Sequence, residues 1–434
     1  MAELDGPTLP LRAVPRKAST GDGWRAPQHR DGMALVASSG VSSVIGMLFW
    51  VLAARLFDPA AVGTSSAAIS AMTLLGSAAH LNLGNALLRF VPVAGGRAAV
   101  VVAGSLAVGT GVALLLGLGF AAGAGWWAPE LVEAFGYPAL VAFFAVSTPV
   151  WTLFVLQDAV LTALRRADLV LVENLVFAVL KLGLLAAAAG LGLAAGIAVS
   201  WVASTALVVV VVVAWLARAL RAVPAAPTDQ RVGVRDLATF VRADYAGNLF
   251  WQAAVFGLPL VVIGLAGPDG AATYGVVWQI AFALYLVAIG MGKSMVAHTA
   301  AATDVAAAAE RARRGMERKA QTLVVPGAVG AAVLSYPVLS LFGSTYAETG
   351  TLLLVLLALS AVPNVVTNAT VWAARVRRDS AVLVGLPAVQ SVAVFAGTLV
   401  LVPLLGVVGA GWAWLGTQCV LAAVILLRRA RRVR

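Results

Sequence analysis

Long apolar runs recur along almost the whole chain, and they constrain its fold more than any other feature. A helix that crosses a bilayer needs about 20 mostly apolar residues, because each residue adds only about 1.5 Å to its length. Of the residues, 61% are hydrophobic and only 11% are charged, whereas soluble domains carry roughly a quarter charged residues. We therefore predict an all-α membrane protein with twelve spans, at residues 33–57, 60–88, 97–122, 138–164, 168–191, 195–217, 238–265, 271–299, 321–342, 348–374, 380–403 and 406–428.

The positions of the cations predict the orientation of these spans. Of the 30 Lys and Arg residues, 27 fall in the two tails and the even-numbered connections, and none falls in the odd-numbered connections. Short loops rich in Lys and Arg stay in the cytoplasm, so both termini are predicted to be cytoplasmic. The net charge of +11 is then a topology signal. Its expected partner is anionic lipid on the cytoplasmic side, and nucleic acid is not expected as a partner. The odd-numbered connections carry acids, namely Asp58, Glu130, Glu133, Asp269 and Glu348.

The predicted spans fall into two halves. Six spans on each side give both halves the same orientation, which is a parallel repeat. Residues 56–64 align with residues 265–273 without gaps, and Leu, Pro and Thr match in register. A charged, Ala-rich stretch at 304–321 predicts a helix on the cytoplasmic surface between spans 8 and 9. The predicted domains are a disordered cytoplasmic tail at 1–31, an N-lobe with helices 1–6 at 32–217, a cytoplasmic linker at 218–237, a C-lobe with helices 7–12 at 238–428, and a basic cytoplasmic tail at 429–434.

Several kinds of chemistry are not expected from this sequence. Gly292-Lys293-Ser294 looks like the end of a phosphate loop, but Val287 stands where that loop needs a glycine and no strand precedes it. Cys419 is the only cysteine and the three histidines are far apart, so we predict neither a disulfide nor a metal site. The longest external connection, at about 123–137, is too short to enclose an active site, so we do not expect an enzyme.

Ionisable residues within the spans are the main candidate functional residues, because charge is costly at membrane depth. Lys181 lies roughly 20 Å into its span with no acid within a helical turn, so we expect it to face an aqueous cavity and bind substrate. Asp244 and Lys293 lie at matching depths, about 9 Å from the inner ends of spans 7 and 8. They form either a structural ion pair, or a gate or ligand site. Asp158 and Glu173 lie near the inner face, where Arg165 and Arg166 can neutralise them.

The other candidate residues lie nearer to the membrane surfaces or are uncharged. Arg55 and Arg89 are candidate substrate-binding cations at the outer and inner mouths of a cavity, alongside Lys181 and Lys293. Both arginines can alternatively be ordinary interfacial residues. Gln252 and Gln279 join Asp158, Asp244 and Glu173 as candidates for gating or ion coupling. The two glutamines can alternatively form hydrogen bonds between helices.

Three short motifs lie in the first half of the chain, namely ARLFDPAAVG at residues 54–63, NLGNALLRFVP at residues 82–92 and QDAVLTALRR at residues 157–166. They resemble, in order, the first hairpin, the end of helix 2 and the end of helix 4 of the polysaccharide-export flippases, which move lipid-linked oligosaccharides across membranes. In that family, an Arg-Leu-x-x-Pro-x-x-x-Gly turn follows helix 1. These flippases belong to the multidrug/oligosaccharidyl-lipid/polysaccharide exporter superfamily.

The resemblance implies both an architecture and a substrate. The expected architecture is two six-helix lobes around a central cavity in the cell (plasma) membrane, with no bound cofactor. The expected activity is transfer of a polyprenyl-(pyro)phosphate-linked oligosaccharide from the inner to the outer leaflet by alternating access, for cell-surface polysaccharide biosynthesis. Polysaccharide assembly proteins are the expected protein partners. The rival function is a cation-coupled antiporter that exports small organic cations or drugs, which requires buried acids without a cationic partner.

Overall fold

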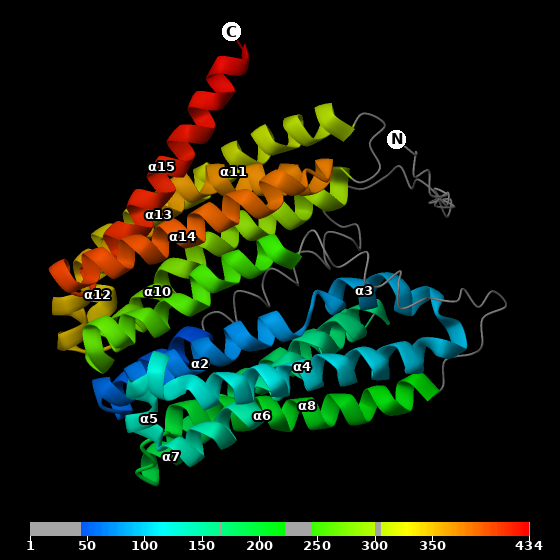
Figure 1. The fold of residues 1–434 in the computed structure, drawn as a ribbon, viewed down its shortest axis with the longest axis vertical. Coiled ribbons are helices and arrows are strands. Elements are labelled where there is room, and N and C mark those ends of the chain that lie inside the picture. Colours follow the sequence, from blue (N-terminus) through cyan, green and yellow to red (C-terminus); the bar gives the residue numbers. More distant parts are fainter. Residues whose placement is uncertain (1–44, 165, 222–244, 300–304, 434) are drawn as a thin grey trace, which may run out of the picture. The chain divides into compact units, whose positions relative to one another are not determined.

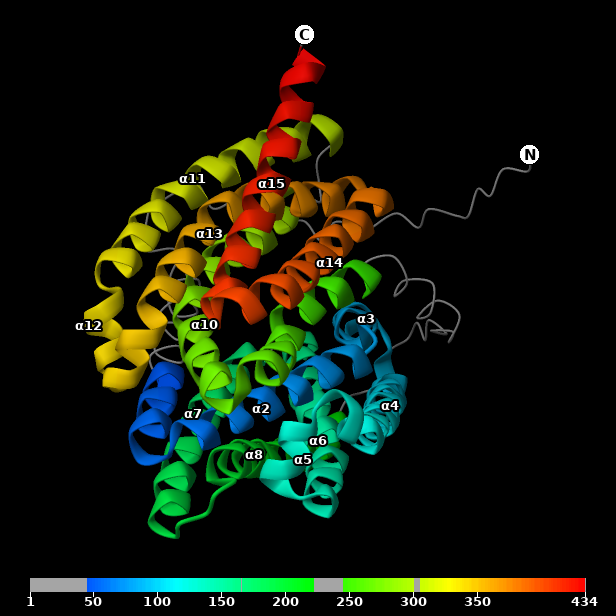
Figure 2. The same ribbon diagram turned by 60° about the vertical axis from the view of Figure 1, so that its left-hand side comes forward.

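The computed structural model describes residues 45–164, 166–221, 245–299 and 305–433, and within these ranges the chain forms helices and no β-strand. Their arrangement is shown in Figures 1 and 2. The all-α architecture of a multi-pass membrane protein is confirmed, whereas the count of twelve spans stays a prediction. Nine helices in the described ranges are long and apolar enough to cross a membrane, namely Pro59–Ala79, Gly95–Trp127, Tyr137–Ala163, Asp168–Gly190, Gly196–Leu220, Tyr245–Gly292, Ser344–Arg377, Ser380–Leu405 and Val408–Arg431.

The first half contains a short apolar helix, Ile45–Leu56, followed by seven labelled helices. Proline stands in the first turn of three of them, where its fixed φ suits a helix start and its missing N–H costs no hydrogen bond. The last helix continues four residues into the predicted linker, because no turn signal interrupts it before Arg221. The seven helices are α2 (Pro59–Ala79), α3 (Leu83–Phe90), α4 (Ala98–Trp127), α5 (Pro129–Phe135), α6 (Tyr137–Ala163), α7 (Ala167–Gly190) and α8 (Gly196–Arg221).

The second half begins with a helix at Tyr245 that passes through a π-helical turn, Ala253–Gly257, into α10 (Leu258–Thr299). Within α10 the chain reverses at Gly267, whose φ of 71° is a conformation that glycine adopts without strain. The Tyr245–Gly292 segment therefore contains both predicted spans 7 and 8. The remaining helices are α11 (Val305–Val333), α12 (Ser335–Ser340), α13 (Ser344–Arg377), α14 (Ser380–Leu405) and α15 (Val408–Val433).

Predicted span 2 is wrong as a single helix, because the chain breaks between α2 and α3. Leu81 and Asn82 have φ angles of 47° and 58°, in the left-handed region. Two hydrogen bonds from neighbouring side chains stabilise the break. The backbone N–H of Asn82 donates to His80 Nδ1 at 3.1 Å, and Asn85 Nδ2 donates to Asn82 Oδ1 at 2.6 Å. Asparagine tolerates the left-handed region better than most residues, which places the break at this position.

One other predicted boundary is also wrong. The helix expected at 304–321 and the first part of predicted span 9 form one continuous helix, α11, since no turn signal separates the charged stretch from the apolar run. The rest of that predicted span contains the short helix α12. The predicted basic tail at 429–434 is helical as far as Val433, as an extension of α15. The predicted tail at 1–31 lies outside the described residues.

The two halves meet where α2 packs against α10. A Cβ atom at Gly63 would overlap the carbonyl oxygen of Pro268 and would lie 2.9 Å from the backbone nitrogen of Ala272, so the two backbones touch. Gly63 and Ala272 are aligned positions of the two similar sequence segments, 56–64 and 265–273. Equivalent positions of two copies meet when a two-fold axis passes between them. This contact therefore supports a parallel repeat with its axis between α2 and α10.

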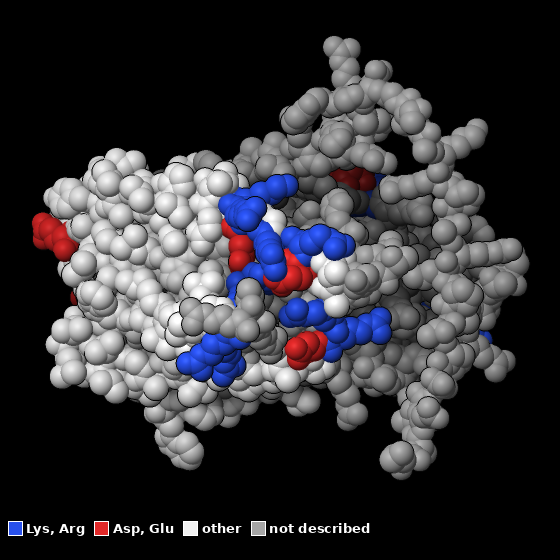
Figure 3. All heavy atoms as spheres, turned by 90° about the horizontal axis from the view of Figure 1, so that it is seen from above, with Lys and Arg blue, Asp and Glu red and all other residues white. Residues whose placement is uncertain are grey.

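Charged side chains join the ends of α11, α13 and α15. Arg313 bonds to both Glu310 and Glu317 at 2.6 Å, and Glu317 also accepts from Arg429 of α15 at 2.8 Å. The Arg429 guanidinium in turn donates to Thr370 Oγ1 of α13 at 2.7 Å. Figure 3 shows acidic and basic side chains gathered in a band on this face, beside a broad area with hardly any charge. We call Glu310, Arg313, Glu317 and Arg429 the charge cluster.

Candidate functional site

A pocket of about 330 Å³ in the C-lobe combines aromatic and polar side chains. Its walls come from the helix that begins at Tyr245 and from α10, α13 and α14. Apolar walls with a few placed polar groups are typical of sites for small organic ligands. We call this site the polar-aromatic pocket. Its polar and aromatic lining residues are Asn248, Trp251, Phe282, Thr367, Asn368, Trp372, Arg375 and Gln390.

One face of α13 fixes several of these groups. Asn364, Asn368 and Trp372 follow one another at intervals of four residues, which places them on the same side of the helix. Asn368 Nδ2 donates to Asn364 Oδ1 at 3.0 Å, and Trp372 Nε1 donates to Asn368 Oδ1 at 3.0 Å. The guanidinium carbon of Arg375 lies 4.2 Å from the centre of the Trp372 ring. The pocket therefore presents an indole, an amide and a cation in fixed positions.

Gln390 of α14 brings a hydrogen-bond donor to the same pocket. The residue is 5% exposed, and its Nε2 has no acceptor among the described residues. A buried donor without a partner costs roughly 1–3 kcal/mol, so this position favours a ligand that supplies an acceptor. Gly247 allows its helix to approach α14 closely beside the pocket, because a Cβ atom there would overlap the carbonyl oxygen of Leu383.

Lys181 lies elsewhere, in an aromatic box within the N-lobe. Its ammonium lies 5.0 Å from the ring centre of Phe49, 4.8 Å from that of Phe177 and 4.2 Å from that of Trp201. The residue is 4% exposed, so the expectation that it faces an aqueous cavity is wrong for this structure. Aromatic faces attract a desolvated cation, which explains how the lysine is held without a neighbouring acid. Its role in substrate binding stays a prediction.

Arg55 joins the two halves through hydrogen bonds to backbone carbonyl groups. Its Nε donates to the carbonyl oxygen of Leu341, and its Nη2 donates to that of Ser340, both at 2.8 Å. These carbonyls belong to the end of α12, where backbone acceptors are left without partners inside the helix. The planar fork of the guanidinium suits two neighbouring acceptors.

Asp158 of α6 and Glu173 of α7 bring their carboxyl groups within hydrogen-bonding distance of each other. Gln157 Nε2 donates to Glu173 Oε2 at 3.4 Å. The predicted neutralisation by Arg166 is wrong, because Arg166 bonds to Asp168 at 3.0 Å, and Arg165 lies outside the described residues. Two adjacent carboxyl groups repel each other when both are ionised, and this pair has no counter-charge among the described side chains that bond to it.

The remaining predicted site residues are not brought together by the described part of the chain. Asp244 lies outside it, as do the side chains of Arg89 and Lys293, so the Asp244–Lys293 pair stays a prediction. Gln252 is half-buried directly before the π-helical turn, a type of distortion that is frequent at functional sites. Gln279 is exposed on α10.

Sequence reasoning missed most of the polar-aromatic pocket. Arg375 was counted as a loop cation, and Trp251, Trp372 and Gln390 were not considered. The one available signal was the four-residue spacing of Asn364, Asn368 and Trp372 within an apolar span.

Comparison with known proteins gives matches only among solved structures, since no protein family and no curated protein matches the sequence. A multidrug resistance MATE family transporter of the MOP superfamily, in its inward-facing conformation, is similar with a TM-score of 0.69 and 17% identity, over 90% of this chain and 94% of that chain. The lipid II flippase MurJ in its inward closed conformation gives a TM-score of 0.63 at 11% identity, over 92% and 87% of the two chains. A MOP superfamily transporter from Pyrococcus furiosus gives 0.60 at 17% identity, over 92% of each chain. This chain has the MOP transporter fold.

The MOP transporter fold has two lobes, which agrees with the architecture expected from the sequence motifs. The resemblance to the superfamily is thereby confirmed at the level of the fold. These similarities do not separate drug transporters from flippases, because both kinds of protein have this fold. Specificity therefore has to be argued from the chemistry of the described side chains.

Proposed function

We propose that this protein is a flippase for a sugar chain carried on a polyprenyl (pyro)phosphate. It moves this lipid-linked oligosaccharide from the inner to the outer leaflet of the plasma membrane by alternating access, for the biosynthesis of a cell-surface polysaccharide. The proteins that make and assemble the polysaccharide are its partners. A sugar and pyrophosphate headgroup cannot cross about 30 Å of hydrocarbon unaided, so the protein must offer it a polar path.

The composition of the polar-aromatic pocket carries this proposal. The indole of Trp251 offers a flat face on which the C–H face of a sugar ring stacks, and Asn248, Asn368 and Gln390 offer amides for hydroxyl groups. Arg375 at the edge of the pocket suits a phosphate, because hydrogen bonds from a guanidinium to phosphate are among the strongest that proteins make.

The test is flipping of a fluorescent polyprenyl-pyrophosphate-linked sugar in proteoliposomes, read as the fraction of label that a membrane-impermeant reductant can reach. We expect Trp372→Ala to slow flipping about tenfold or more, because it removes the ring on which the Arg375 guanidinium lies and the hydrogen bond to Asn368. Trp412→Ala is the matched control, since Trp412 is 47% exposed on α15 and lies outside the pocket lining. Equal flipping by both variants would exclude the pocket as the sugar site.

The second candidate function is the cation-coupled antiporter, and the carboxyl pair favours it. Glu173 is buried and Asp158 is half-buried, and their described surroundings hold no cation bonded to either acid. Uptake of ethidium driven by an imposed proton gradient, lost in Glu173→Gln but kept in Trp372→Ala, would favour this function over the flippase.

A further inference from the structure

The wall that α14 gives to the polar-aromatic pocket is apolar around one buried amide. Its lining residues Leu383, Pro387 and Gln390 are spaced by four and three positions, which places them on one side of the helix. A helical side chain leans toward the N-terminal end of its helix, so the Gln390 amide lies over the turn that contains Pro387. Gln390 is 5% exposed, and its Nε2 has no acceptor among the described residues. This wall therefore offers a ligand a hydrogen-bond donor set in hydrocarbon.

A carbonyl group matches this wall better than a hydroxyl group does. A hydroxyl oxygen could accept from Gln390 Nε2, but its own hydrogen would then be turned toward the apolar side chains of Leu383 and Pro387. Burying a polar hydrogen without a partner is costly. A carbonyl oxygen only accepts, so it leaves no hydrogen unpaired. An acetyl group adds a methyl group, which gains from contact with the hydrocarbon beside the donor.

The N–H of an acetamido group can be matched by another wall of the pocket. In a trans amide the N–H points away from the C=O, so it would be directed from α14 into the pocket. Asn368 of α13 accepts a hydrogen bond on Oδ1 from Trp372 at 3.0 Å, and an amide oxygen has two lone pairs. The second lone pair suits the N–H of the ligand. The pocket can therefore satisfy both polar atoms of an acetamido group.

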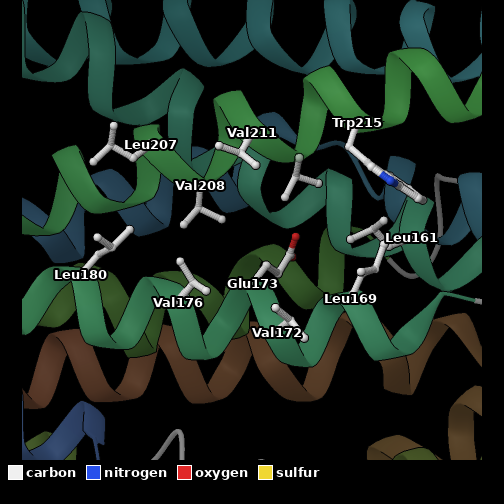
Figure 4. A pocket seen from close by; sticks show the side chains of 11 residues that line it. Leu161, Leu169, Val172, Glu173, Val176, Leu180, Leu207, Val208, Val211 and Trp215 are labelled. Atoms are coloured by element: carbon white, nitrogen blue, oxygen red, sulfur yellow. The ribbon is translucent and has the colours of Figure 1, made fainter.

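A second pocket, of about 450 Å³ between α7 and α8, offers no such match. Figure 4 shows its leucine and valine walls and the side chain of Glu173, which points from α7 toward α8. A carboxylate only accepts hydrogen bonds, so it disfavours a carbonyl oxygen beside it. The match to an acetamido group therefore belongs to the polar-aromatic pocket.

We propose that the sugar bound in the polar-aromatic pocket carries an acetamido group, and that Gln390 selects N-acetylated sugars over plain hexoses. The carbonyl oxygen accepts from Gln390 Nε2, and the methyl group packs against Leu383 and Pro387. This inference rests on the proposed flippase function and names the class of sugar that is moved. Sites discriminate strongly when one substrate pairs a buried polar group and its competitor does not.

Two fluorescent lipids that differ in one group test this selection in proteoliposomes. Each carries a single sugar on polyprenyl pyrophosphate with the label on the same hydroxyl group, and the sugar is N-acetylglucosamine in one lipid and glucose in the other. We expect the unmodified protein to flip the N-acetylated lipid about tenfold faster at equal, low concentration. Gln390→Met keeps the length of the side chain and removes the donor, so it should bring this ratio close to one.

Val389→Met is the matched control. Val389 is 56% exposed on the same helix and lies outside the pocket lining, so this variant should keep the tenfold ratio. Because the ratio compares two lipids on one protein, a lower yield of a variant does not change it.

The results that contradict the proposal can be told apart. Equal flipping of the two lipids by the unmodified protein would overturn the selection of N-acetylated sugars and leave the flippase function in place. An undiminished ratio in Gln390→Met would also overturn it, because the acetamido group would then be recognised elsewhere. Flipping of neither lipid by folded protein would overturn the flippase function, and the selection with it.

Discussion

At the scale of single residues, Lys181 shows how a membrane-buried cation can be held without an acid. Three aromatic rings lie within 5.0 Å of its ammonium. A desolvated cation gains about 2 kcal/mol or more from such a contact. The depth and isolation of Lys181 could be predicted from the sequence. The aromatic box around Lys181 could not be predicted, because Phe49 and Trp201 lie on other helices. Periodicity within one helix does not reveal contacts between helices.

Replacing Lys181 by methionine tests the aromatic box. Lys181→Met keeps the length of the side chain and removes a charge that is costly to bury, so we expect equal or higher thermal stability, by about 1 kcal/mol. Flipping in proteoliposomes should be retained. Trp201→Ala should instead cost about 3–5 kcal/mol, because it leaves a cavity beside the lysine. Normal stability with abolished flipping in Lys181→Met would return Lys181 to the role of phosphate ligand.

At the scale of helices, the close approach of α2 and α10 depends on a missing side chain. Gly63→Ala would push a methyl group into the backbone at Pro268, so we expect a loss of about 1–3 kcal/mol of stability. Gly111→Ala in α4 is the matched control, since a Cβ atom there would meet nothing within 4 Å. That control should be neutral or stabilising by up to about 1 kcal/mol through helix propensity. Thermal unfolding in detergent compares the two variants.

The charge cluster predicts a pH dependence for the stability of α11, because Glu310 bonds to Arg313 and Arg314 of the same helix. Hydrogen bonding from Arg313 lowers the pKa of Glu310 from 4.5 to about 2. A lowered pKa in the folded state means that Glu310 contributes stability above pH 4.5, and that this contribution is lost as the pH falls toward 2. Glu310→Gln should therefore cost up to about 1 kcal/mol at pH 7, a small value because the site is partly exposed.

Thermal unfolding at several pH values measures this effect. The difference between Glu310→Gln and the unmodified protein should shrink steadily between pH 4.5 and 2. A difference that stays constant down to pH 2 would mean that the charge of Glu310 contributes nothing. Glu133→Gln, in the exposed part of α5, controls for the general effect of removing one carboxyl group.

The helices themselves were largely predictable, and the distortions within them were not. The apolar run at 380–403 corresponds to α14 at Ser380–Leu405, because hydrocarbon thickness sets the length of a span. The break at Leu81 and Asn82 has no comparable signal. The carbonyl oxygen of Ala78, beside the break, accepts from the N–H of Leu81 and also from the hydroxyl group of Tyr245, a residue of the other half. Such a distortion depends on tertiary contacts, as does a pocket lined by four different helices.

At the scale of the whole molecule, Arg55 links the two halves at the end of α12. Arg55→Ala removes two hydrogen bonds from a charged donor, each worth about 1.5–3 kcal/mol in proteins. We expect this end to open more often, so that a cysteine introduced at Ser340 in a Cys419→Ser background reacts with maleimide about tenfold faster. Arg55→Lys should have an intermediate effect, because an ammonium lacks the planar fork. An unchanged labelling rate in Arg55→Ala would mean that the link does not hold the halves together.

The close contact between Gly63 and Ala272 is a pivot about which the two halves would rotate. Both residues lie near the turns that start α2 and follow Gly267, whereas Ala78 and Tyr245 lie at the opposite ends of their helices. In a rotation about the first contact, displacement grows in proportion to distance from the pivot. The hydrogen bond from Tyr245 to Ala78 lies far from the pivot. It therefore opposes the rotation with a greater torque than an equally strong hydrogen bond beside the pivot. The single hydroxyl group of Tyr245 would then govern the motion more strongly than its bond energy alone suggests.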